Sequence, residues 1–77
     1  MKRLISSNGE IFFYNEKNIC VREISSDGQI EIYDDNGKIT RTIFSDDEIW
    51  FYDKDQRIVK IIYANGTEES TLWILEV

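Results

Sequence analysis

Apolar and polar residues alternate at a spacing of two along most of the chain, as in residues 29–33, which read QIEIY. This spacing is typical of β-strands, because successive side chains of a strand point to opposite faces of the sheet. Val, Ile, Thr and aromatic residues dominate the alternating segments, no proline interrupts them, and no segment sustains a helical period of 3.6. We therefore expect an all-β protein with seven to eight short strands.

The pattern repeats every 19 residues, without a gap through the first three copies. The four repeats are residues 5–23, 24–42, 43–61 and 62–77. Each of the first three holds two turn signals, for example Asp27-Gly28 and then residues 34–37, DDNG. Asn-Gly and Asp-Gly favour hairpin turns in which both central residues have positive φ. The sequence predicts one domain over residues 1–77, an antiparallel meander of four hairpin repeats whose last copy diverges as a capping repeat does.

One face of the predicted sheet is free of charge in the shorter strands. It carries the columns Ile11/Phe13, Ile30/Ile32 and Ile49/Phe51. We expect these columns to form the interior. A chain of this length buries about 60–65% of its unfolded surface. The sheet is therefore expected to be curled or closed into a small barrel-like sheet, which would also hide its open edges.

Composition and net charge argue against several classes of function. The 77 residues hold 9 Lys+Arg against 15 Asp+Glu, a formal net charge of −6, which disfavours direct binding of nucleic acid. There is no histidine and one cysteine, Cys20, which removes histidine-based catalysis and Cys/His zinc sites. The Asp-rich turns lack the ligand register of a calcium loop. We expect no enzyme activity, no cofactor and no metal, and no membrane segment. The lone cysteine and the absence of an apolar leader predict a cytoplasmic protein.

The motif G-x-I-x-x-Y-D-x-x-G-[KR]-I runs from Gly28 to Ile39 and is echoed by Tyr52-Asp53 and Arg57-Ile58. Over residues 24–66 it resembles the YD repeat of RHS-type proteins and the variant MORN repeat of small bacterial antitoxin-like proteins. RHS repeats build large shells, for which four repeats are too few. The resemblance therefore implies an immunity or antitoxin protein that neutralises a cognate toxin.

Residues 44–56 hold five carboxylates against the single cation Lys54. The turn at Asp34 and Asp35 should lie at the same end of the meander as the turn at Asp53 and Asp55. Clustered negative charge steers a basic partner, such as a nuclease toxin whose active site it could mask. The alternative is that these Asp residues serve turn geometry and solubility.

An aromatic column consists of Tyr14, Tyr33 and Tyr52, joined by Phe12 and Trp50. Its candidate anchors are Tyr33, Trp50 and Tyr52, because interfaces favour Tyr and Trp. The alternative is ordinary cross-strand packing. Arg22, Arg41 and Lys60 form a cationic column. We expect it to be a solvated stripe, and the alternative is a binding site for sugar or phosphate. The predicted partner-binding residues are Tyr33, Asp34, Asp35, Asp46, Asp47, Glu48, Trp50, Tyr52, Asp53 and Asp55.

Two other functions remain open at this point. The chain could be a structural, self-associating β module like the YD repeats. It could also be a carbohydrate-binding module that uses its Tyr and Trp rings as platforms.

Overall fold

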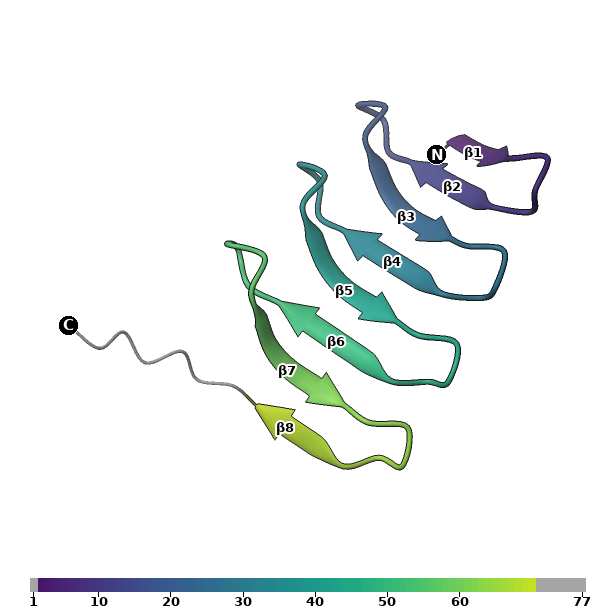
Figure 1. Cartoon of the computed structure of the whole chain (residues 1–77). Helices are drawn as coiled ribbons and strands as arrows, with labels where there is room; N and C mark the ends of the chain where they lie inside the picture. The colour runs from purple at the N-terminus through teal and green to yellow at the C-terminus, as the bar shows by residue number, and fades with distance from the viewer. Residues whose placement is uncertain (1, 71–77) are drawn as a thin grey trace.

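A computed structural model of the chain describes residues 2–70, and these form a single antiparallel sheet (Figure 1). The sheet order is β1 to β8, so every strand pairs only with its neighbours in the sequence. The strands are β1 (Lys2–Ile5), β2 (Ile11–Tyr14), β3 (Cys20–Ile24), β4 (Ile30–Tyr33), β5 (Ile39–Ile43), β6 (Ile49–Tyr52), β7 (Ile58–Ile62) and β8 (Glu68–Ser70). The predicted all-β meander is confirmed. Residues 71–77 of the fourth repeat lie outside the described residues.

Of the two predicted forms, curled or closed, the structure has the first: the sheet is somewhat curled and stays open instead of closing into a barrel. Strands β1 and β8 are its two edges, and its extents are 45 × 30 × 16 Å. The pairing explains why it stays open. A barrel requires the register to shift steadily from strand to strand. Here Ile5, Ile11, Ile24 and Ile30 lie directly opposite one another in turn, so no net stagger accumulates along that row.

All seven turns have the same backbone geometry, which differs from the predicted one. In residues 25–29, the Ser25 N–H donates to Gln29 O at 2.8 Å and the Gly28 N–H donates to Ser25 O at 3.0 Å. Only the fourth residue of each turn has positive φ, so the expectation of two positive-φ residues is wrong. These are three-residue hairpin loops with a bulge. The fourth residues are Gly9, Asn18, Gly28, Gly37, Asp47, Gln56 and Gly66.

A row of isoleucines crosses seven strands on one face of the sheet. The row consists of Ile5, Ile11, Ile24, Ile30, Ile43, Ile49 and Ile62, and Glu68 takes the same place in β8. We call it the isoleucine ladder. In residues 2–70 no apolar side chain is fully buried, and the one buried residue is Thr42, 3% exposed. The Ile/Phe columns are therefore half-buried on an open face, and the prediction that they form an interior is wrong, because no second layer covers them.

The cationic column lies on the same face as the isoleucine ladder. Arg22 is opposite Phe13 and Ile32, and Arg41 is opposite Ile32 and Phe51. The Arg22 guanidinium lies 4.9 Å from the Phe13 ring centre, and that of Arg41 lies 5.6 Å from the Phe51 ring centre. Glu31 does not lie between these cations, because it is on the other face, opposite Glu23 and Thr42. Apolar and aromatic side chains keep the cations two strands apart, about 10 Å.

Candidate protein-binding surface

The turns lie alternately at the two ends of the strands (Figure 1). Each end thus carries a row of turns, and these two rows are distinct from the edge strands β1 and β8. We call turns 15–19, 34–38 and 53–57 the Asx edge, and turns 6–10, 25–29, 44–48 and 63–67 the acidic edge. Strands of four or five residues separate the two edges by roughly 15 Å. The structure therefore brings Asp34, Asp35, Asp53 and Asp55 to one edge, as expected. It places Asp46, Asp47 and Glu48 at the other.

On the Asx edge the first residue of each turn binds the backbone of its own loop. Asp34 Oδ1 accepts hydrogen bonds from the N–H groups of Asn36 and Lys38, both at 2.9 Å. Asp53 Oδ1 accepts the equivalent bonds at 2.8 and 3.0 Å, and Asn15 makes the same pair with its amide oxygen. These bonds lower the pKa of the Asp34 and Asp53 carboxyls, because they favour the charged form. The two carboxylates stabilise their turns.

The acidic charge of the Asx edge is largely compensated. Arg57 Nη2 lies 3.0 Å from Asp55 Oδ2, and Arg57 Nε lies 3.5 Å from Asp53 Oδ2. The three turns together hold five acids and four bases, a net charge of −1. The acids are Glu16, Asp34, Asp35, Asp53 and Asp55, and the bases are Lys17, Lys38, Lys54 and Arg57. This edge has little net attraction for a basic partner.

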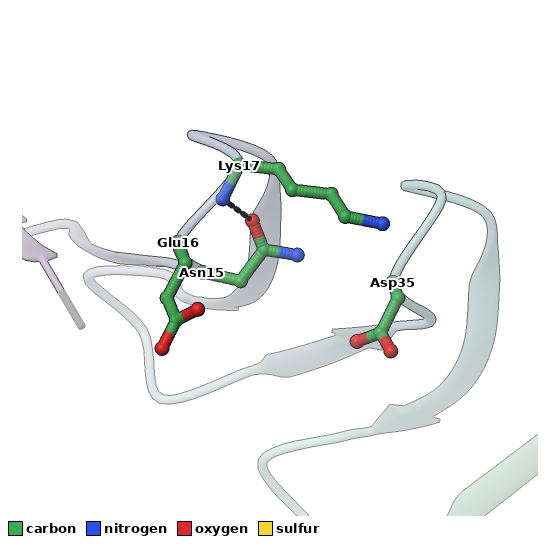
Figure 2. Close-up of a pocket in the computed structure, with 4 residues that line it drawn as sticks. All are labelled: Asn15, Glu16, Lys17 and Asp35. Atoms are coloured by element: carbon green, nitrogen blue, oxygen red, sulfur yellow. Dashed lines mark hydrogen bonds between the residues drawn. The ribbon is translucent and has the colours of Figure 1, made fainter.

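An open hollow of about 360 Å³ lies between two neighbouring turns of the Asx edge. Asn15, Glu16, Lys17 and Asp35 line it, and the Lys17 side chain extends toward the turn that carries Asp35 (Figure 2). Among residues 2–70 there is no group of three His, Cys, Asp or Glu side chains that could hold a metal ion.

The Asp34 and Asp53 carboxylates predict how stability changes with pH. Their lowered pKa means that they stabilise the fold above the unfolded-state value of about 3.9, and that this contribution is lost as the pH falls through the folded-state pKa. We expect Asp34→Asn/Asp53→Asn to fold, since Asn15 already forms this turn with an amide. Urea denaturation between about pH 5 and pH 2 should show a shallower loss of stability for the double variant than for the wild type.

Asp35→Asn is the control for this measurement, because Asp35 shares the turn but accepts neither of its backbone bonds. It should leave the acid-induced loss as in the wild type. Equal slopes for the wild type and the double variant would contradict the assignment.

The acidic edge differs from the Asx edge because its four turns contain no lysine or arginine. Their five carboxylates are Glu10, Asp27, Asp46, Asp47 and Glu48. Asp46 Oδ1 accepts the Glu48 N–H at 3.0 Å, and Glu48 Oε2 accepts the Trp50 indole N–H at 2.5 Å. Successive turns on one edge are two strands apart, so the five charges extend over roughly 20 Å. This edge carries the densest uncompensated charge in the described part of the chain.

Glu10 and Asp27 were missed in the sequence analysis, although the 19-residue period contains the signal. Asp27 takes the place of Asp46 one repeat earlier, and Glu10 takes the place of Glu48 two repeats earlier. Residues 44–56 are one acidic stretch in the sequence, but in the structure residues 44–48 lie on the acidic edge and residues 53–56 lie on the Asx edge. Columns of the repeat locate charge in this fold better than runs along the sequence.

The predicted aromatic anchors lie on the face opposite the isoleucine ladder, and their polar atoms bind within the sheet. Tyr33 donates to Glu31 at 2.6 Å, and its hydroxyl lies 3.3 Å from Glu23. Partial burial and these two carboxylates raise the pKa of Tyr33. The Tyr52 hydroxyl is 3.1 Å from that of Thr42. Of the three predicted anchors, Trp50 alone is tied to the acidic edge, through its hydrogen bond to Glu48.

Trp50 is held in place by a second contact. Its ring packs edge-to-face on Phe44, with the ring centres 5.1 Å apart. Phe44 and Glu48 are the first and last residues of the same turn. Residues 44–50 thus combine an indole held by Phe44 and Glu48 with a turn that carries three carboxylates, a combination suited to a protein interface.

No protein-family model matches the chain, and no curated protein shows a significant match to it. Within residues 2–70 no helix has the length and apolarity that crossing a membrane requires.

Proposed function

We propose that this chain is a non-enzymatic protein-binding module that docks its acidic edge on a basic protein. The observation that carries the proposal is the set of five carboxylates in four turns without a single cation among them. Such a field raises the association rate of a basic partner and orients it before contact. The residues that engage the partner are Asp46, Asp47, Glu48 and Trp50, with Glu10 and Asp27 extending the charged surface.

The partner we propose is a toxin, with a basic nuclease as its specific form. Nucleases bind phosphates with cationic active sites, and a rigid row of carboxylates can occupy those sites. The resemblance of the motif to antitoxin-like repeats supports this choice, and the open, shallow surface of the sheet is compatible with docking onto another protein. Asp34 and Asp53 of the originally predicted set act in their own turns, and Asp55 is paired with Arg57.

Co-expression with the product of the adjacent reading frame tests the proposal. We expect growth arrest by that product, and rescue by this chain. With the two purified proteins, Asp46→Asn/Asp47→Asn/Glu48→Gln should lower the association rate constant by roughly tenfold at low salt. The variant keeps the turn, because Asn tolerates positive φ and the Gln amide oxygen can still accept the Trp50 N–H.

The matched control is Glu16→Gln/Asp35→Asn/Asp55→Asn, which removes the same charge from the Asx edge. It should change the rate constant less than about twofold. Equal losses for both variants, or a rate constant that is indifferent to salt, would exclude the acidic edge as the docking surface. An adjacent product that neither arrests growth nor binds would exclude the toxin assignment.

A further inference from the structure

Both faces of the sheet are open. The strands form one sheet with no second layer in residues 2–70, and none of the apolar side chains in that range is fully buried. Sheets of globular proteins ordinarily cover at least one apolar face with another layer. The isoleucine ladder is a continuous apolar row that lacks such a cover within the described chain.

The two faces carry opposite charge. The face with the isoleucine ladder, here the arginine face, holds four bases and one acid. The bases are Arg3, Arg22, Arg41 and Lys60, and the acid is Glu68, whose carboxylate lies 3.1 Å from Lys60 Nζ. The other face, here the glutamate face, holds Glu23, Glu31 and Glu69 in one row, with Lys2 as its only base among the paired strand residues.

We infer that copies of this chain stack face to face, with the arginine face of one copy on the glutamate face of the next. Stacking opposite faces pairs the Arg22 and Arg41 guanidinium groups with carboxylates, whereas stacking like faces would bring like charges together. It also covers the isoleucine ladder with the aromatic and aliphatic side chains of the second face. These include Phe12, Trp50 and Ile61, which lie in the same row as the glutamates.

The size of the faces fits a weak but specific contact. Eight strands about 4.8 Å apart, each roughly 15 Å long, present on the order of 500 Å² per face. Two faces in contact would bury about 1,000 Å², which is near the lower limit of specific interfaces. We therefore expect dissociation constants on the order of micromolar to millimolar.

The contact joins two different surfaces, so it does not close on itself. A dimer still presents one free arginine face and one free glutamate face, and it adds further copies as the concentration rises. Sedimentation velocity should show an average mass that increases steadily with protein concentration. The mass should fall when the salt is raised from about 50 to about 500 mM, because the charge pairs are screened.

Two complementary variants test the pairing. Arg22→Gln/Arg41→Gln removes two cations from the arginine face, and Glu23→Gln/Glu31→Gln removes two carboxylates from the glutamate face. Each variant alone should self-associate at least about tenfold more weakly than the wild type. Mixed in equal amounts, they should form dimers and little beyond, because each brings one intact face. Far-UV circular dichroism checks that both are folded.

Lys17→Gln/Lys38→Gln is the control, because it removes two cations from the Asx edge and should leave assembly unchanged. A wild type that is monomeric up to about 1 mM would overturn the inference. Wild-type association that strengthens with salt would also overturn it. Both of these measurements use the wild type alone, so they test the inference even if a variant fails to fold. Stronger assembly by one of the two variants would instead indicate like-face stacking, because the substitutions would then remove repulsion between like charges. Assembly unaffected by either would indicate edge pairing through β1, where Leu4 and Ile5 are exposed.

Discussion

Ile43→Asp is expected to remove half or more of the free energy of unfolding of this protein. Ile43 lies inside the isoleucine ladder, directly between Ile30 and Ile49. The substitution removes a half-buried aliphatic group and places a carboxylate among apolar side chains, at a cost of about 2–4 kcal/mol. A domain of this length has a stability of roughly 4–12 kcal/mol, and one without a buried interior should lie at the lower end. Urea titrations followed by circular dichroism and tryptophan fluorescence would measure the loss.

Ile5→Asp makes the same chemical change at the outer end of the same ladder. Ile5 is 62% exposed and has one cross-strand neighbour, Ile11. We expect this variant to keep a cooperative transition, with a loss of about 1 kcal/mol or less. If the two substitutions cost the same free energy, the ladder does not hold the sheet together.

Deletion of one whole repeat, residues 24–42, should yield a folded six-stranded sheet. The deletion joins Glu23 to Ile43, which then takes the position of Ile24, and Phe44 begins the next turn where Ser25 did. Because each strand contacts only its neighbours, the product loses one repeat and gains no new type of interface. We expect the far-UV spectrum of a β-sheet and a cooperative transition at lower urea concentration than in the wild type.

Deletion of residues 24–41, one residue fewer, is the control and should not give a folded protein. It leaves Thr42 between Glu23 and Ile43, so β3 is one residue too long for its two partners. Pairing with β2 then places Thr42 in the isoleucine ladder, while pairing with β6 places it on the opposite face, and a slip of one residue reverses every side chain. A stable, cooperatively folding product of this deletion would refute the registers described above.

The strands could be predicted from the sequence because the local signals for strands and turns agree with the repeat. Alternation marks the strands, Asn-Gly and Asp-Gly mark turns, and the 19-residue period assigns Ile5, Ile24, Ile43 and Ile62 equivalent places. Closure could not be inferred in the same way, since it depends on stagger between strands. The turn type was misjudged because Asp27-Gly28 suits a two-residue loop as well as the third and fourth positions of the loop that forms.

The candidate site was harder to predict than the fold, for an electrostatic reason. Counting acids in residues 44–56 does not show that Arg57 pairs with Asp55, or that Asp53 is committed to backbone N–H groups. It also hides Glu10 and Asp27, which reach the acidic edge only through the repeat. Net charge is a property of the chain, whereas the field that a partner meets is set by which turns share an edge.

The strand order has a mechanical consequence. A chain that pairs each strand only with its sequence neighbours has its first and last strands at opposite ends of the sheet. A pull applied between those strands acts across them, along the inter-strand hydrogen bonds, and so strains one hairpin ladder after another instead of shearing many ladders at once. We expect such a sheet to yield gradually at low force, one strand at a time, and to behave as an extensible tether more than as a rigid clamp.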